Sequence, residues 1–167
     1  ATGETSVGFK EQGSGGTAGG DLASKIKLTK VDADDNAVVL KNAVFTVTSP
    51  DGSTFDLTTG ADGTVTSGNL QQGTYKVKET TAPAGYELNY QEYTLTVDGK
   101  TAAVQTIVDK PIKTSVKVTK AWVGPQGGAV TVHLLANGTD TGKTLKLSAD
   151  NNWTDSFSDL RAVNADG

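Results

Sequence analysis

Cysteine is absent from this sequence of 167 residues, and histidine occurs once, at His133. The missing cysteines exclude disulfide bonds and thiolate metal sites, so an extracellular form of the chain needs another source of stability. With one histidine and no cysteine, a Ser-His-Asp triad, a Cys-His pair or a zinc centre is not expected. We therefore predict no metal site and no cofactor.

The sequence also lacks long apolar runs and a strong excess of either charge. No run approaches the roughly 18 residues of a membrane span, and residues 1–20 lack the hydrophobic core of a signal peptide. The formal net charge of -4 gives no electrostatic reason to expect nucleic acid or an anionic membrane as a partner. We expect neither nucleic-acid binding nor membrane insertion in this fragment, and any export signal or wall anchor lies outside it.

What the chain does contain is a composition typical of β-structure. Threonine and valine are abundant, which favours short strands and turns over helices. The length allows one large or two small domains. We predict an all-β protein with tandem immunoglobulin-like β-sandwich modules over residues 21–112 and 113–167, the second incomplete. Residues 1–20, which end in a glycine-rich run, are expected to be a flexible linker or the remnant of an upstream domain.

The first module has the strand spacing of a sandwich. Short alternating stretches are separated by turn signals such as PDG at 50–52 and DG at 98–99. Strands are expected at 25–31, 43–48, 55–58, 73–79, 92–97 and 103–108. Strands of this number and length, without helical periodicity, indicate a sandwich of about the immunoglobulin size.

Three of these strands direct a charged residue toward their apolar side. Alternation puts Lys30, Glu79 and Asp109 on the same faces as the apolar residues two positions before them. A buried charge without a partner is so unfavourable that it becomes neutral or finds a specific partner. Because the first and last strands of an antiparallel sandwich can be neighbours, we expect the three side chains to meet in one core.

Each of these positions is also compatible with an ordinary structural role. A lysine at a strand end commonly extends its amine to water, and Asp109 precedes Lys110-Pro111, where an aspartate can simply belong to a turn. A buried salt-bridge cluster is the main alternative for the group as a whole.

A lysine amine and a carboxyl group held together away from water can condense into an amide. Burial favours the neutral forms of both groups. A protonated Glu79 would donate a hydrogen bond to the acceptor carboxyl of Asp109, polarise it and transfer protons as water leaves. Holding amine and carboxyl in contact can lower the barrier by ~7–11 kcal/mol. The reaction would occur once per molecule, without turnover.

The segment 75–86, YKVKETTAPAGY, resembles the glutamate motif of pilin-type, prealbumin-like domains related to the B repeats of collagen adhesins on Gram-positive bacteria. The segments LTKVD at 28–32 and IVD at 107–109 are similar to that family's first and last strands, in the expected order. The resemblance implies a spontaneous isopeptide bond between Lys30 and Asp109, with Glu79 as catalytic acid and base. Many relatives carry asparagine at the acceptor, so here the leaving group would be water instead of ammonia.

Such a bond would compensate for the missing cysteines. It ties the first strand to the last and restricts the unfolded chain as a disulfide does, without sensitivity to reduction.

After Pro111 the pattern restarts, and Lys120 takes the place that Lys30 holds in the first module. Stretches at 130–138, 145–148 and 151–153 resemble a collagen-adhesin B-type repeat. No glutamate follows Glu92, so Lys120 is a possible second cross-link donor whose partner is missing. We expect a truncated or proteolysed piece of a longer multi-domain protein, or completion of this module by another segment or chain.

An acidic segment with Asp32, Asp34 and Asn36 superficially fits a calcium loop. It lacks the turn glycine and the distal bidentate glutamate of such a loop, so we expect an exposed acidic hairpin.

These observations together predict a structural stalk module of a Gram-positive pilin or adhesin, extracellular and anchored to the cell wall. Its expected partners are other domains or subunits of the surface protein or pilus. The alternative is a binding module that recognises a host matrix protein or glycan. A conventional enzyme is disfavoured, because the inward-facing residues would react with one another and leave no substrate site.

Overall fold

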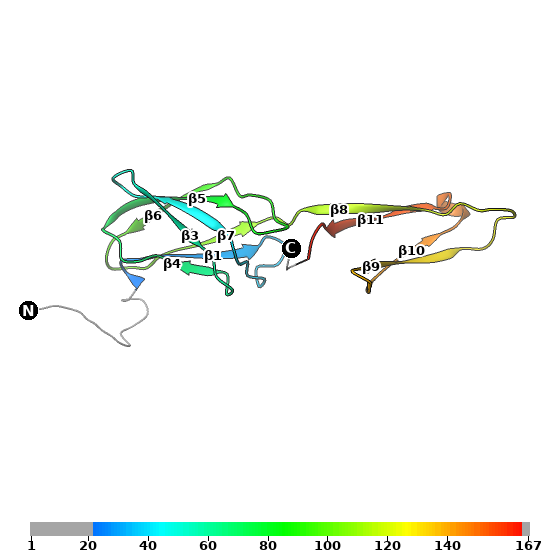
Figure 1. Ribbon diagram of the computed structural model, residues 1–167, viewed down its shortest axis with the longest axis horizontal. Coiled ribbons are helices and arrows are strands. Elements are labelled where there is room, and N and C mark those ends of the chain that lie inside the picture. Colours follow the sequence, from blue (N-terminus) through cyan, green and yellow to red (C-terminus); the bar gives the residue numbers. More distant parts are fainter. Residues whose placement is uncertain (1–21, 165–167) are drawn as a thin grey trace, which may run out of the picture. The chain divides into compact units, whose positions relative to one another are not determined.

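The computed structural model describes residues 22–164, so the linker expected at 1–20 lies outside the described residues. The chain divides into two compact units at the bond between Pro111 and Ile112, called unit 1 and unit 2 below (Figure 1). Regular structure in the described residues consists of strands and one short 3-10 helix. None of the helical structure found there is long and apolar enough to cross a membrane.

Unit 1 is a sandwich of two sheets. Its strands are β1 (Ile26–Asp32), β2 (Val44–Thr48), β3 (Thr54–Thr58), β4 (Thr64–Thr66), β5 (Gly73–Thr81), β6 (Glu92–Val97) and β7 (Ala103–Asp109). One sheet has the order β4-β1-β7 and the other the order β3-β2-β5-β6. The prediction of an all-β sandwich is confirmed.

The first and last strands of unit 1 are neighbours, but they run parallel, unlike the antiparallel pairing of the other strands in the two sheets. The register runs from Ile26 opposite Ala103 to Asp32 opposite Asp109. The expected neighbourhood of these two strands is therefore found, but their direction differs from that of an antiparallel sandwich. The reason is that the loop after β6 brings the chain to the beginning of β1, where β7 then starts.

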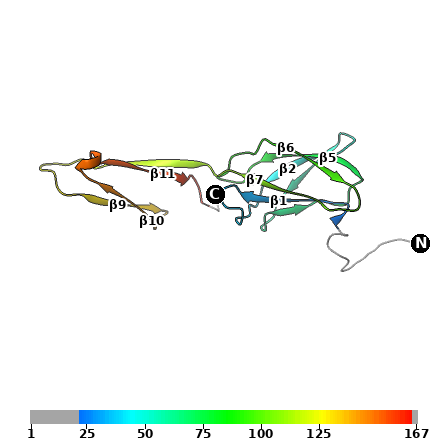
Figure 2. The same ribbon diagram turned by 180° about the vertical axis from the view of Figure 1, so that it is seen from behind.

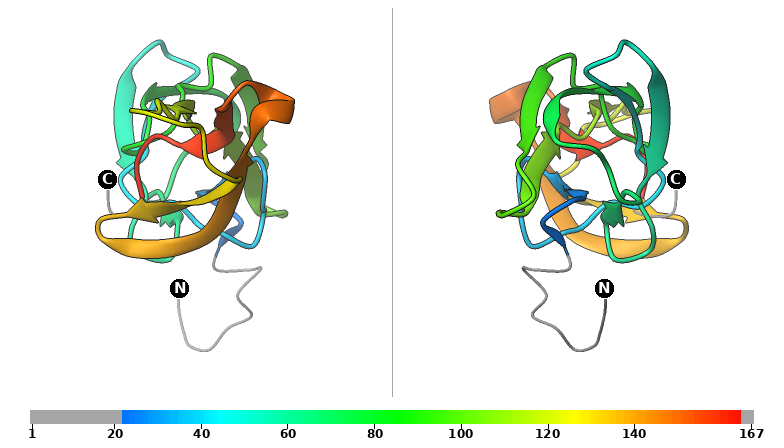
Figure 3. Two further views of the ribbon diagram at one scale, coloured as in Figure 1. Left: turned by 90° about the vertical axis from the view of Figure 1, so that its right-hand side faces the viewer. Right: turned by 90° about the vertical axis from the view of Figure 1, so that its left-hand side faces the viewer.

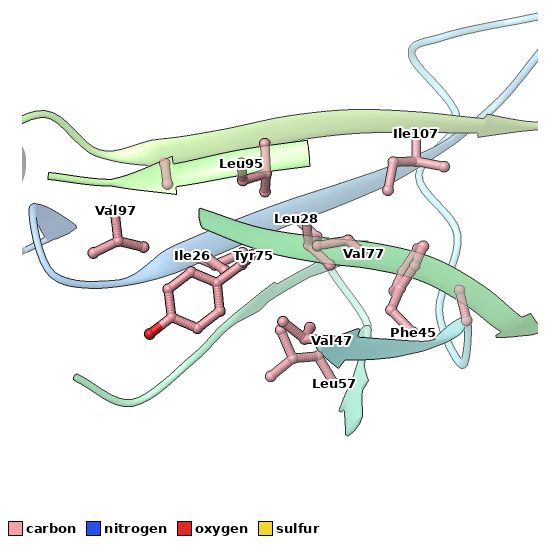
Figure 4. Packing of buried hydrophobic residues seen from close by; sticks show 12 residues of the cluster. Ile26, Leu28, Phe45, Val47, Leu57, Tyr75, Val77, Leu95, Val97 and Ile107 are labelled. Atoms are coloured by element: carbon pink, nitrogen blue, oxygen red, sulfur yellow. The ribbon is translucent and has the colours of Figure 1, made fainter. Parts of the chain in front are cut away.

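The core lies between the two sheets, as Figure 4 shows. Alternation along β5 buries Tyr75 and Val77 and leaves Lys76 and Lys78 exposed, as predicted. Both sheets contribute to the fully or nearly fully buried cluster: Ile26, Leu28, Ala43, Phe45, Val47, Leu57, Tyr75, Val77, Leu95, Val97, Ala103 and Ile107. At ~25 cal/mol per Å² of buried apolar surface, this cluster is the main source of stability for unit 1.

Strand β4 was not expected. It has only three residues and pairs antiparallel with Lys27–Thr29 of β1, directly after a tight turn at Gly63. Gly63 has φ +74 and donates its N–H to the Gly60 carbonyl at 2.9 Å. A strand this short carries no alternation that a sequence pattern can reveal.

Unit 2 consists of two antiparallel strand pairs. Its elements are β8 (Lys113–Thr119), β9 (Val130–Ala136), β10 (Thr139–Leu147), the 3-10 helix η1 (Ala149–Asn151) and β11 (Thr154–Arg161). β8 pairs with β11 and β9 with β10, as seen from behind in Figure 2, and the β9–β10 hairpin is a strongly curved ribbon in Figure 3. Its buried apolar residues are Leu147, Trp153 and Phe157.

Candidate functional site

Three charged side chains from three strands meet in the core of unit 1. Lys30 comes from β1, Asp109 from β7 and Glu79 from β5 in the facing sheet. The Lys30 Nζ lies 2.5 Å from Asp109 Oδ1 and also contacts Glu79 Oε1. The side chains of Lys30, Glu79 and Asp109 are 0%, 1% and 0% exposed. No lysine at this site extends its amine to water.

Strand register explains how the lysine and the aspartate reach each other. In the parallel pair, Lys30 lies opposite Ile107, two residues before Asp109. Their side chains therefore sit diagonally on the inner face, within reach of a long lysine side chain. The Lys30 backbone is fixed on its other side, where its N–H donates to the Gly63 carbonyl at 2.8 Å.

Glu79 enters from the facing sheet next to a β-bulge. Phe45 of β2 pairs with Glu79, but the next pair along joins Val44 to Thr81, so Thr80 is the extra residue. Such a bulge kinks a strand and redirects the neighbouring side chains, and bulges often lie beside active sites. The bulge thus lies directly beside the carboxylate that faces the other sheet.

The surroundings of the site are apolar. The Lys30 Nζ lies 5.6 Å from the centre of the Phe45 ring. Ile107 and Val77, two residues before Asp109 and Glu79 on the same strand faces, are 2% and 0% exposed. Water is therefore excluded from the amine and the two carboxyl groups by the core itself.

Burial raises the pKa of both carboxyl groups, but the hydrogen bond between them acts on the two pKa values in opposite directions. Loss of solvation, followed by the hydrogen bond with Asp109, raises the pKa of Glu79 to about 8 against the opposing effect of Lys30. Loss of solvation also raises the pKa of Asp109, but there the hydrogen bond with Glu79 and the contact with Lys30 both act to lower it. When the two carboxyl groups hold one proton between them, that proton therefore resides on Glu79.

The hydrogen bonds of the carboxyl oxygens are consistent with a protonated Glu79. Glu79 Oε2 and Asp109 Oδ2 are buried and receive no hydrogen bond from a fixed donor of the described residues. A proton held between the two carboxyl groups relieves this deficit. The site thus combines an amine, an acceptor carboxyl group and a protonated carboxyl group, which are the groups that amide formation requires.

Asp32 is a buried residue that the sequence interpretation misplaced. It was expected in an exposed acidic hairpin, but it is 0% exposed, whereas Asp34 and Asn36 are exposed as expected. The reason is that Asp32 is still part of β1 and lies on the same face as Lys30, two residues earlier. The alternating pattern already contained this signal.

Lys120 does not occupy a site of the same kind. It follows the end of β8 and is exposed, and its Nζ lies 4.8 Å from the centre of the Trp122 ring. The expectation that Lys120 takes the place of Lys30 is wrong for the described residues, and Val116 on the preceding strand β8 is also 43% exposed. The cause is that β8 has a single strand partner and its face is not covered by a second full sheet.

His133, the one histidine of the sequence, lies on β9. It is exposed, and its Nδ1 lies 3.2 Å from Asp140 Oδ2 of the neighbouring strand.

Two family models match this chain in tandem. The model described as a prealbumin-like fold domain matches residues 24–111, and the model described as the Cna protein B-type domain matches residues 116–167. The boundary between the matched segments coincides with the division into units 1 and 2.

Similar proteins were found among sequences and among solved structures. The trypsin-resistant surface T6 protein of Streptococcus pyogenes serotype M6 is 35% identical over 83 residues, which is 49% of this chain and 15% of that protein. The structure of the Bacillus anthracis TIE protein matches with a TM-score of 0.62 at 28% identity, over 81% of this chain and 26% of that one. The major pilin subunit BcpA of Bacillus cereus matches with a TM-score of 0.46 at 24% identity, over 56% of this chain and 30% of that one. The chain thus spans less than a third of the length of each of these relatives.

Proposed function

Because the chain belongs to the prealbumin-like fold domain family, which it matches over residues 24–111, we propose that unit 1 is a structural stalk module stabilised by an isopeptide bond between Lys30 and Asp109. Glu79 acts as the proton donor and acceptor in the formation of this bond. The module reacts once with itself and is not an enzyme in the sense of turning over a substrate.

One observation carries this proposal. The amine of Lys30 contacts both Asp109 and Glu79 in a site from which water is excluded, and burial keeps one carboxyl group protonated near neutral pH. A permanent ion pair needs one carboxylate to balance one ammonium group. The second carboxyl group adds desolvation cost to an ion pair, but amide formation needs a proton donor of this kind.

The reaction balances within the three side chains. Proton transfer from the Lys30 ammonium to the Asp109 carboxylate, relayed by Glu79, gives a neutral amine and a neutral acid. The amine nitrogen attacks the Asp109 Cγ, and the Glu79 proton moves to the departing hydroxyl. One C–N bond forms, one C–O bond breaks, one water leaves, and Glu79 regains its proton from the nitrogen.

The proposed setting is the surface of a Gram-positive bacterium. The similarity to a streptococcal surface protein supports this setting, and the motif of residues 75–86 supports a pilin or adhesin within it. Other domains or subunits of the same surface protein or pilus are the proposed partners.

Intact-mass measurement of the purified chain tests the proposal. The wild-type protein is expected to weigh one water less than its sequence, and digestion should yield one branched peptide that joins Lys30 to Asp109. Lys30→Ala, Asp109→Ala and Glu79→Ala should each restore the full mass.

The matched control is Lys76→Ala, which removes a β5 lysine whose side chain is 49% exposed. This variant should keep the mass deficit of the wild type. A wild-type mass equal to that of the unmodified sequence would mean that the three residues form only a buried ion cluster.

A further inference from the structure

A hydrogen-bonded carboxylate lies next to the site along β1. Asp32 follows Lys30 by two residues and is fully buried. Its Oδ1 accepts the backbone N–H groups of Asp34 at 2.7 Å and Asp35 at 3.2 Å, and its Oδ2 accepts the hydroxyl of Tyr86 at 2.7 Å. Both carboxylate oxygens are therefore satisfied, and they are tied to two different segments of the chain.

Tyr86 reaches Asp32 from the loop that follows β5. Its N–H donates to the Pro83 carbonyl at 3.1 Å and closes a turn, and Pro83 is buried. Gly85 within this turn has φ 84, a conformation that side-chain-bearing residues rarely adopt. The turn thus directs the phenol back toward β1.

The same loop also contacts the chain beyond β7. Tyr86 forms an antiparallel bridge with Pro111, and the N–H of Glu87 donates to the Lys110 carbonyl at 2.9 Å. Both contacts lie directly after Asp109. The segments that follow Lys30, Glu79 and Asp109 therefore converge at one end of the sandwich.

We propose that the hydrogen bond between Tyr86 and Asp32, here called the latch, positions Glu79 against Lys30 and Asp109 for cross-linking and closes this end of the core to water. The inference rests on the cross-link proposed above. Tyr86 is a positioning residue, because it acts through Asp32.

The latch ties the loop that follows the Glu79 strand to the sheet that holds Lys30 and Asp109. Glu79 belongs to one sheet, and Lys30 and Asp109 belong to the other. The latch is a directional bond between the segment that follows Glu79 and β1, and it adds to the backbone contacts that the same loop makes beyond β7. A displacement of ~1 Å at a reacting group can cost about a hundredfold in rate.

The experiment follows cross-linking from the start. Each chain is purified in denaturant before it reacts, folding is started by dilution, and samples quenched at intervals are weighed for loss of one water. Tyr86→Phe removes only the hydroxyl and is expected to slow bond formation about ten- to hundredfold. The control, Tyr90→Phe, alters a tyrosine that is 79% exposed and should react at the wild-type rate.

A second variant separates positioning from a failure to fold. Asp32→Asn weakens the same latch from the other side and should slow the reaction similarly. The double variant should be no slower than the slower single variant, because both changes break one bond. Circular dichroism of each quenched sample checks that the strands have formed.

The dependence of the cross-linking rate on pH distinguishes positioning from a loss of stability. In the wild type the rate should fall as Glu79 loses its proton near pH 8. In Tyr86→Phe, water entering beside Glu79 should shift this fall to lower pH, while Lys30, Asp109 and the neighbouring Asp32 remain in place. A loss of stability alone would lower the yield without moving the alkaline limb.

The outcomes are distinguishable. If the wild type never loses water, the cross-link and the latch both fail. If the wild type loses water and Tyr86→Phe matches its rate and pH profile, the latch alone is overturned. Independent, additive slowing by the two single variants would also overturn it.

Discussion

The variant Glu79→Gln isolates the contribution of the proposed cross-link to stability. Glutamine has nearly the same size as glutamate but cannot release or accept the proton that the reaction needs. The Lys30 amine and the Asp109 carboxylate would remain as a balanced ion pair, so the variant should lack the bond without leaving an uncompensated buried charge.

The expected magnitude follows from the length of chain that the bond encloses. Lys30 and Asp109 are 79 residues apart. The loop-closure relation for a cross-link of this span gives about 4.5 kcal/mol at 25 °C. With a urea dependence of about 1–3 kcal/mol/M, the unfolding midpoint of unit 1 should fall by about 1.5–4.5 M in the variant.

The distribution of aromatic residues allows each unit to be observed separately. All four tyrosines lie in unit 1, at 75, 86, 90 and 93, and both tryptophans lie in unit 2, at 122 and 153. Near-ultraviolet tyrosine signals should therefore report the shift in unit 1. Selectively excited tryptophan fluorescence should show an unchanged transition in unit 2, which makes unit 2 the internal control.

Two results would refute this reasoning. If Glu79→Gln still loses one water, Glu79 is not the proton donor. If the variant is uncross-linked but its unit 1 unfolds within about 1 kcal/mol of the wild type, the loop-closure estimate does not describe this bond.

Two further changes test other features of unit 1. Lys30→Ala leaves two buried carboxyl groups without the amine and should lower the free energy of unfolding by about 3–5 kcal/mol more than Glu79→Gln does. The pKa values of Glu79 and Asp109 are raised in the folded state, so the folded state keeps protons that the unfolded state releases. Urea midpoints of Lys30→Ala should therefore fall as pH rises from 4.5 to about 8, and a flat or rising profile would contradict this. Gly63→Ala would place a Cβ 2.5 Å from Val39 Cβ at φ +74 and should cost about 2–5 kcal/mol. Gly52→Ala, at φ +87 with nothing within 4 Å, should cost only about 1–2 kcal/mol, and equal losses for the two glycines would refute the steric argument.

Much of unit 1 could be predicted from the period of two in its strands. The inward positions of Lys30, Glu79 and Asp109 follow from alternation, because each strand has one buried and one exposed face. The neighbouring first and last strands could be expected as well. Their parallel direction could not be predicted, because strand direction depends on the path of the connecting loops. The alternation of buried and exposed residues is the same for either direction.

The latch shows a different limit of prediction from the sequence. Asp32 and Tyr86 are 54 residues apart, and their bond depends on a loop whose course is fixed by a turn at Gly85 and by contacts beyond β7. The turn residues could be recognised in the sequence. Their chemistry specifies a local bend, but it does not specify which residue the Tyr86 hydroxyl contacts after the turn. Treating Asp32 as a turn residue also concealed its place on the inner face of β1.

The parallel pairing of β1 with β7 has a consequence for a chain that is pulled from both ends. In this arrangement the incoming and outgoing chain leave at opposite ends of the pair, so tension acts along the strands in shear and does not peel the hydrogen bonds apart one by one. With an amide between Lys30 and Asp109, the tension would pass from β1 directly into the end of β7. The segment between them, whose fully extended length is roughly 270 Å at about 3.4 Å per residue, would remain outside the path of the force and could not be drawn out. A row of such modules would therefore behave mechanically as a tether of nearly fixed length.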